Sequence, residues 1–221
     1  MRLDFVYILF LLFFFACQKD KFESIDYSNN KNYVSNKIGS YSEFSVQEII
    51  YDDFKNTIDT ISYQLKELNE SLFKDKLGRN SIRIDRYSRN NDTANWSYLN
   101  TWYTSIDIHS IERIENNTRK SILSFPITYD AVWNSNEFNM EYVNNVFYTS
   151  FHKPYSLNTI KYDSSITVES ATVSNSIKER AYKEVYVKHI GLAYKTIVFI
   201  DKIGTLQRGK RINYKLLKHV P

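Results

Sequence analysis

Pairs of carboxylates are the side chains of this sequence whose types and spacing could support acid–base catalysis. Glu112 and Glu115 lie three positions apart, Asp107 precedes them, and Asp52 stands next to Asp53. Two carboxyl groups that face one cleft can supply the acid and the base, or the nucleophile, of glycoside cleavage. Such residues more often belong to solvated strand edges and turns. We therefore expect a protein that is not an enzyme, and keep a glycan hydrolase as the third hypothesis.

The histidines lack the spacing of a metal site. His109, His152, His189 and His219 are widely separated, whereas a zinc site needs three or four ligands, usually with two close in sequence. Serine catalysis would need a Gly-x-Ser-x-Gly motif, which is absent. We expect no metal and no cofactor.

One glycine-containing segment, Gly204 to Lys210, matches most of a phosphate-binding P-loop. The pattern fails at Arg211, where a Ser or Thr hydroxyl would bind magnesium, and too little chain follows for the required helix. We interpret the segment as a basic β-turn and expect no nucleotide.

The aromatic residues suggest binding. Trp96, Trp102 and Trp133, with 18 tyrosines and 14 phenylalanines, could form a platform for sugar faces or apolar ligands. The alternative is that these rings fill a β core and its rim, as aromatic residues in strands usually do.

The amino-terminal segment predicts export and lipidation. An unbroken apolar run from Val6 to Ala16 follows Arg2. It is too short for a transmembrane helix, which needs about 20 apolar residues, and has the length of a signal peptide. Phe14-Phe15-Ala16-Cys17 resembles the lipobox of bacterial lipoproteins. The resemblance implies removal of residues 1–16 and attachment of diacylglyceryl and acyl chains, such as palmitate, to Cys17.

Cys17 is the one cysteine of the chain, so a disulfide within the protein is excluded and lipid attachment is its one plausible role. The predicted location is the outer membrane, with the membrane reached through the lipid. Lys19-Asp20 resembles the signal that sends some Bacteroidota lipoproteins to the cell surface. Both the periplasmic face and the cell surface stay open.

The charge argues against nucleic acid as a partner. The net charge is +4 with a pI of about 8.9, and signal cleavage removes one base and one acid. The two signs alternate along the chain without the clustered basic stripe of a nucleic-acid binder.

The remaining chain predicts a flexible tether at 17–40 and a β-rich domain at 41–221. Alternating apolar and polar residues indicate strands at 81–88, 102–108, 111–115 and 185–200, the last broken at Gly191. Over 58–72 the apolar residues fit both a helix and a strand, and we favour a strand at 61–67 followed by a helical turn or loop. A short helix is predicted over 174–183. The expected fold is a single mainly-β domain, a curved antiparallel sheet, sandwich or half-barrel, with at most one or two short helices.

Several segments resemble a group of uncharacterised Bacteroidota outer-membrane lipoproteins. They are Arg83–Tyr87, Ile114–Asn117, Phe125-Pro126 with Trp133–Asn136, and Glu184–Lys195, and the resemblance spans about residues 55–200. It implies a β-dominated envelope protein. The group has no assigned activity, so it implies no catalytic residue.

We therefore expect a lipid-anchored outer-membrane domain that is a non-catalytic binding or accessory subunit of an envelope complex. The alternative is a stand-alone carrier of an apolar or glycan ligand on the concave side of the sheet. Asp59-Thr60-Ile61 and Asp92-Thr93-Ala94 also resemble the O-glycosylation sequon of exported Bacteroidota proteins, which predicts Thr60 and Thr93 as modified, exposed residues.

Overall fold

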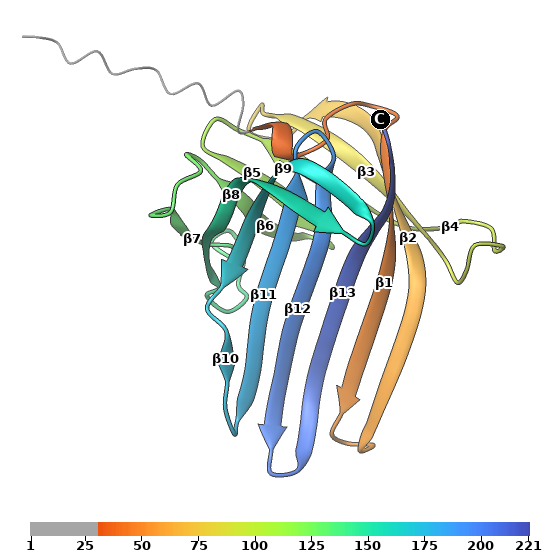
Figure 1. Cartoon of the computed structure of the whole chain (residues 1–221), viewed down its shortest axis with the longest axis vertical. Coiled ribbons are helices and arrows are strands. Elements are labelled where there is room, and N and C mark those ends of the chain that lie inside the picture. Colours follow the sequence, from red (N-terminus) through yellow and green to blue (C-terminus); the bar gives the residue numbers. More distant parts are fainter. Residues whose placement is uncertain (1–30) are drawn as a thin grey trace, which may run out of the picture.

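The computed structural model describes residues 31–221, which form a single mainly-β domain with no α-helix in that range (Figure 1). The fold class predicted from the sequence is confirmed. The predicted signal peptide (1–16), the lipidation site Cys17 and the first part of the tether lie outside the described residues. Within 31–221 no helix is long and apolar enough to span a membrane. The strands are β1 (Tyr41–Asp52), β2 (Thr57–Lys74), β3 (Asn80–Arg89), β4 (Ser97–Ile106), β5 (Ser110–Glu115), β6 (Thr118–Ser124), β7 (Val132–Asn134), β8 (Asn145–Leu157), β9 (Ile160–Ser170), β10 (Val173–Ser174), β11 (Lys178–Val187), β12 (Gly191–Ile203) and β13 (Leu206–Val220).

The strands described for residues 31–221 belong to one antiparallel sheet. Their order is β6-β5-β4-β3-β2-β1-β13-β12-β11-β9-β8-β7, and β10 pairs with β11. The two outermost strands of this order approach each other. Ser121 N donates to the Ser135 carbonyl at 2.9 Å, and the Trp133 indole Nε1 donates to the Ser121 carbonyl at 2.9 Å. The upper part of the sheet is therefore nearly closed, while its lower part is open, and we call the whole a half-barrel.

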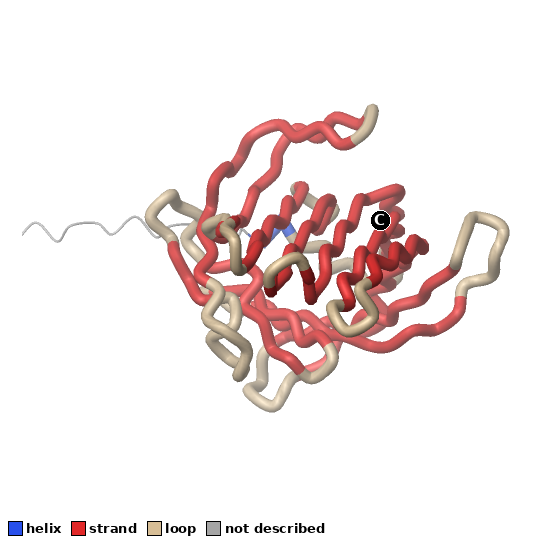
Figure 2. Tube along the Cα trace, turned by 90° about the horizontal axis from the view of Figure 1, so that it is seen from below, coloured by secondary structure: helices blue, strands red, loops and turns tan. Residues whose placement is uncertain are grey.

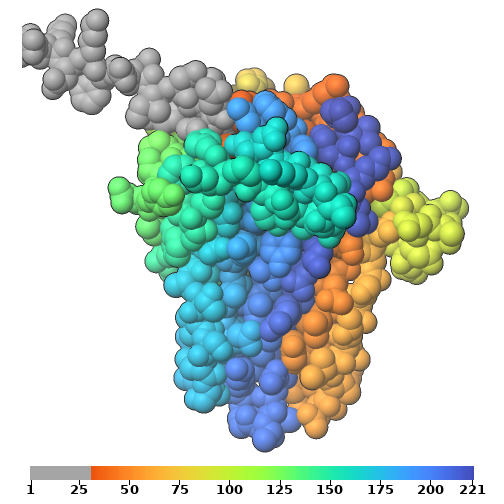
Figure 3. All heavy atoms as spheres, viewed as in Figure 1, coloured from red at the N-terminus to blue at the C-terminus, as the bar shows by residue number. Residues whose placement is uncertain are grey.

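Five long strands give the molecule its shape. β1, β2, β11, β12 and β13 run side by side and extend well beyond the rest, ending in hairpin turns at the lower end of Figures 1 and 3. The pairing between β2 and β3 ends at Gln64 of β2, which pairs with Arg89 of β3. Seen from below, the strands curve around a central row formed by the long strands (Figure 2). A hollow of about 920 Å³, lined by residues of β1, the β1–β2 turn, β12 and β13, lies along the lower halves of these strands, and we call it the trough.

The core fills the upper, nearly closed part. Alternation places Phe44, Leu65 and Leu216 on one face of neighbouring strands, where each is at least 97% buried. The burial of such side chains is the main favourable term in folding. Glu48 and Ile61, on the same face farther along, are half-buried and exposed respectively. The core therefore ends where the trough begins.

The segment before β1 belongs to the core, so the prediction of a flexible tether as far as residue 40 is wrong for its last part. Tyr33 is fully buried, and its hydroxyl bonds with His152 Nδ1 at 2.7 Å and Ser164 Oγ at 2.8 Å. Gly191 lies under the same segment, where an added Cβ would meet Ser35 N at 3.5 Å. An apolar ring with two hydroxyl partners explains why Tyr33 docks.

Three predicted elements are corrected. Residues 174–183, predicted as a helix, form the end of β10, a turn and the first part of β11, because Asn175 Oδ1 accepts the backbone N–H groups of Ile177 and Lys178 and closes a turn. The strand predicted over 185–200 is the end of β11 and most of β12, joined by a turn at 188–190 in which His189 has φ 66°. β2 continues to Lys74 where a helical turn or loop was predicted; a register shift between Asn69 and Ser71 interrupts its alternation.

Candidate binding site at the mouth of the half-barrel

A second hollow opens where the closed upper part meets the trough. We call it the mouth pocket. Its volume is about 630 Å³, and its walls come from β1 to β6, β12, β13 and the loop before β8; it is lined by Glu48, Tyr63, Arg86, Trp102, Glu115, Asn116, Thr118, Lys120, Glu141, Tyr142, Lys195, Ile197, Phe199, Lys210, Ile212 and Tyr214. Ligand pockets of small molecules have about 300 to 1,000 Å³. The mouth pocket therefore has the size of a small-ligand site.

Arg86 is the central cation of the pocket floor. Its Nε donates to Glu67 Oε1 at 3.0 Å, and its guanidinium carbon lies 3.4 Å from the centroid of the Trp102 ring. Only 3% of Arg86 is exposed. A planar guanidinium suits this combination of stacking and hydrogen bonding, which a lysine could not reproduce.

A second buried ion pair continues the floor. Lys195 Nζ lies 2.8 Å from Glu184 Oε1 and 3.8 Å from Glu115 Oε1. The Tyr186 hydroxyl donates to the other oxygen of Glu184. Arg113 Nη1 lies 3.7 Å from Glu67 Oε2 and connects the two pairs electrostatically. Each buried charge thus has an opposite charge beside it, as buried ions require.

The pKa values of this network favour the charged forms. Burial by itself raises the pKa of the Glu184 carboxyl, but Lys195 and the tyrosine hydroxyls that bond to it more than compensate, so the net shift is downward. Burial likewise lowers the pKa of Lys195, and Glu115 and Glu184 reverse this, so the net shift is upward. Burial and the charge of Glu184 raise the pKa of the Tyr186 phenol well above its usual value. The pair is ionised at neutral pH and Tyr186 stays a donor.

The three predicted tryptophans have different positions. Trp102 lines the mouth pocket, and its Nε1 donates to Asn116 Oδ1 at 3.2 Å. Trp96 lies in the loop between β3 and β4, 4.3 Å from the Arg89 guanidinium. Trp133 is a core residue whose ring lies 5.0 Å from that of Tyr148. The structure therefore brings one of the three to the pocket, and the predicted common platform does not form.

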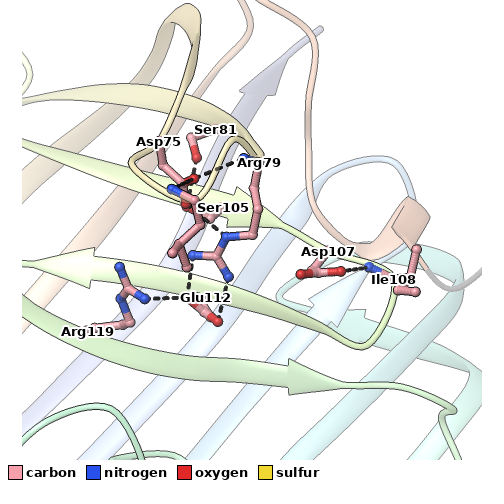
Figure 4. A network of polar contacts seen from close by, with 9 residues as sticks. Asp75, Arg79, Ser81, Ser105, Asp107, Ile108, Glu112 and Arg119 are labelled. Atoms are coloured by element: carbon pink, nitrogen blue, oxygen red, sulfur yellow. Dashed lines mark hydrogen bonds and ion pairs between the residues drawn. The ribbon is translucent and has the colours of Figure 1, made fainter.

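The predicted carboxylates are also dispersed. Glu112 and Glu115 point to opposite faces of β5, as their odd spacing requires. Glu112 accepts two hydrogen bonds from Arg79, at 2.8 and 2.9 Å, and Arg119 lies 3.5 Å away (Figure 4). Asp107 accepts from Ile108 N, and Asp52 accepts from Phe54 N and Lys55 N in the turn after β1. Of this set, only Glu115 lines the mouth pocket.

The remaining candidate residues have structural surroundings. His152 bonds to Tyr33 and His219 Nδ1 to Ser42 Oγ at 3.0 Å. Among residues 31–221 no group of three or more metal-ligating side chains gathers. Gly204 and Thr205 form the turn between β12 and β13, which agrees with the predicted turn, but the rest of the predicted segment, Leu206 to Lys210, already belongs to β13. Thr60 on β2 and Thr93 in the turn after β3 are exposed, and their modification stays a prediction.

Sequence reasoning missed most of the pocket. Tyr63 donates to Glu48 Oε1 at 2.8 Å, and the rings of Tyr142 and Phe199 lie 5.2 Å apart. The sequence held part of the information, since Tyr63 and Phe199 lie in segments whose apolar and polar residues alternate as in a strand. The register between strands, which the sequence does not reveal, places these rings around one hollow.

Two solved structures resemble this fold in part. Each covers 85% of this chain and 98% of its own, with 9% identity: a proposed lipoprotein from Parabacteroides distasonis with a TM-score of 0.46 and a proposed exported protein with a YmcC-like fold from Bacteroides fragilis with a TM-score of 0.43. Neither a protein-family profile nor a curated protein sequence matches the chain. Likenesses this distant say nothing about activity or ligand.

Proposed function

We propose that this protein is a non-catalytic binding protein of the cell envelope, held in the outer membrane by lipid on Cys17, which binds a glycan in the mouth pocket. The mouth pocket itself carries the proposal. It combines a ligand-sized hollow with aromatic rings and many hydrogen-bonding groups. Aromatic faces with polar groups around them suit sugar rings, which have apolar faces and hydroxyl edges.

The charges of the mouth pocket favour a polar ligand over an apolar chain. Lys120 lies 3.6 Å from Glu141, and Lys195 lies between Glu115 and Glu184. An alkyl chain would remove the partly exposed Lys120–Glu141 pair from water without replacing its hydrogen bonds, which is costly. Sugar hydroxyls can donate to the carboxylates and accept from the cations. The carrier of an apolar ligand is therefore the weaker alternative.

The carboxylates of the mouth pocket support binding without catalysis. A glycoside hydrolase needs one carboxyl group that keeps its proton near neutral pH, with a second carboxylate opposite it. Glu115 lies 3.8 Å from Lys195, Glu141 lies 3.6 Å from Lys120, and Glu48 accepts a hydrogen bond from the Tyr63 hydroxyl. Each of the three carboxylates that line the pocket is thus engaged by a neighbouring side chain, which supports a binding role.

The test is a bacterial glycan array followed by calorimetric titration of the glycans that bind. Tyr142→Ala removes an exposed ring from the mouth pocket, and Tyr129→Ala removes a similarly exposed ring that packs on Phe151 elsewhere. We expect Tyr142→Ala to weaken binding about 10-fold, as loss of one good ring contact would, and Tyr129→Ala to leave it unchanged. Equal effects of the two substitutions, or the absence of any binding glycan, would refute the proposed site. Cleaved glycan in the mixture would favour a hydrolase, and a lipid retained in native mass spectra would favour the apolar carrier.

A further inference from the structure

The lower half of β2 is a free sheet edge. β2 pairs with β1 along Thr57–Leu68, but its pairing with β3 begins only at Gln64. Among residues 31–221, no strand pairs with Thr57–Tyr63 on the side away from β1. Residues 57–62 are exposed. We call residues 57–63 the β2 edge.

The direction of the backbone groups along the β2 edge follows from one contact. Asn69 N donates to the Ser40 carbonyl at 3.0 Å, and Gly39 N donates to the Asn69 carbonyl at 2.8 Å, so both groups of Asn69 point toward β1. The β1–β2 pairing has no register shift, and backbone groups alternate along a strand. Odd-numbered residues therefore point toward β1. The N–H and C=O groups of Ile58, Thr60 and Ser62 point to the free side.

The β2 edge has little of the usual protection. Natural edge strands are short, carry charges (especially lysine) or proline, or are covered, and the one charge of this edge is Asp59. The β2 edge has neither lysine nor proline. On the other side of the trough, the lower part of β11 is covered by β10, through Val173 with Arg180 and Ser174 with Glu179. Within the part of the chain that the structure describes, β10 thus covers part of the β11 side of the trough, whereas the β2 side presents an uncovered row of backbone donors and acceptors.

Charge indicates what would pair with the β2 edge. The hairpin around it, residues 48–63, contains Glu48, Asp52, Asp53 and Asp59 against the single base Lys55, in a chain whose net charge is +4. Asp59 lies on the trough side of the edge, and Ile58, which is 65% exposed, lies on the outer side. A strand added here would place alternate side chains beside Asp59 and beside Ile58. The first row, Thr57, Asp59, Ile61 and Tyr63, holds the one charge of the edge, and Glu48 and Asp52 of β1 share its face, so cationic residues suit it. The second row, Ile58, Thr60 and Ser62, is uncharged and suits apolar residues.

We propose that the β2 edge is a docking site for an extended segment of another protein, in which lysine or arginine alternates with apolar residues and which adds to the sheet by backbone hydrogen bonds. Addition of a strand to an exposed edge is an established mode of peptide recognition. The added strand would form the missing side wall of the trough next to Tyr63, which lines the mouth pocket. The two sites meet at Tyr63, but the proposed strand would bond to the backbone of Ile58, Thr60 and Ser62, which do not line the mouth pocket, so each proposal can fail alone.

The test uses a heptapeptide, acetylated and amidated, in which lysine alternates with valine. Amide hydrogen exchange of the full protein, followed by NMR, should show slow exchange at Asp59 and Ile61 and fast exchange at Ile58, Thr60 and Ser62, because only buried or bonded amides are protected. The peptide should protect those three amides. Every second amide of an added strand faces β2. Of two peptides N-methylated on the odd or on the even amides, only the one whose methyl groups block the amides that face β2 should lose this effect. A glutamate-for-lysine peptide should bind at least 10-fold more weakly.

Thr60→Pro and Thr60→Val form the matched pair. Proline at an edge position whose N–H faces solvent is tolerated, so Thr60→Pro should fold and bind the peptide at least 10-fold more weakly, while Thr60→Val should bind within twofold of the original protein. The proposal is overturned if the peptide protects no amide at millimolar concentration, or if the two variants bind equally. It is also overturned if the same three amides become protected with rising protein concentration alone, because the occupant would then be a second copy. Since the exchange pattern is measured in the unmodified protein, the test survives a failure of Thr60→Pro to fold.

Discussion

The guanidinium of Arg86 lies over the indole of Trp102, with 3.4 Å between the guanidinium carbon and the ring centroid. The same side chain donates to Glu67 at 3.0 Å and to Asn100 Oδ1 at 3.2 Å. Arg86 thereby joins the ion network below the mouth pocket to the aromatic wall of that pocket.

Replacement of Arg86 should be strongly destabilising. Arg86→Met leaves Glu67 buried with a weakened set of partners, and breaking one side of a buried pair costs roughly 3 to 5 kcal/mol. Lys183→Met on β11 is the control, because the side chains of Lys183 and its partner Glu169 are 42% and 28% exposed and pairs near the surface contribute about 0 to 1 kcal/mol. Urea denaturation gives both values. Similar losses for the two variants would mean that the network contributes little.

Stability should fall on acidification through Glu184. Its folded-state pKa is lowered from 4.5, so its contribution is complete above the unfolded value and is lost as pH falls through the folded one. Lys195 has a folded-state pKa raised from 10.5, so its contribution is lost only as pH rises through that higher value. We expect a plateau of stability between pH 4.5 and 10.5 from this pair. Urea midpoints against pH should show a shallower acid decline in Glu184→Gln than in the original protein, and parallel declines would contradict the assignment.

The segment before β1 should be necessary for full stability. Tyr33→Ala removes a fully buried ring and should cost about 3 to 5 kcal/mol, as large-to-small core substitutions do. Tyr33→Phe removes only the hydroxyl bonded to His152 and Ser164, which should cost about 1 kcal/mol. Tyr129→Phe, at a 62% exposed position, is the control and should change the unfolding free energy little. If Tyr33→Ala cost no more than that control, residues 31–40 would not be part of the folded domain.

Cys17→Ala should release the protein from the membrane. Several acyl chains, each contributing about 0.8 kcal/mol per buried methylene, hold a lipoprotein stably, and alanine cannot accept them. Fractionation with a radiolabelled palmitate precursor should show a soluble, unlabelled Cys17→Ala protein, while Ser24→Ala stays labelled and bound. A Cys17→Ala protein that stays in the membrane fraction without label would show that lipid is not the anchor.

The sequence by itself determined the β class of the domain and supplied the basis for predicting its export. Alternation along residues 81–88 predicted β3, because a half-buried strand must alternate, and Gly204 marked the β12–β13 turn. The same rule failed over 174–183 because that part of β11 has exposed or half-buried residues throughout, and nothing there alternates. A turn closed by Asn175 also has the residue type of a helix N-cap.

Only the tertiary structure decided which side chains meet. Glu67 reaches Arg86, and Lys195 reaches both Glu184 and Glu115, through strand registers that depend on long-range pairing. Tyr33 shows the same limit, because the polar sequence around it suggests a tether while its ring docks on distant strands. A shift of one residue in pairing moves a whole strand's side chains to the other face. The mouth pocket and the β2 edge are consequences of register and of where β3 leaves β2, which composition and periodicity do not specify.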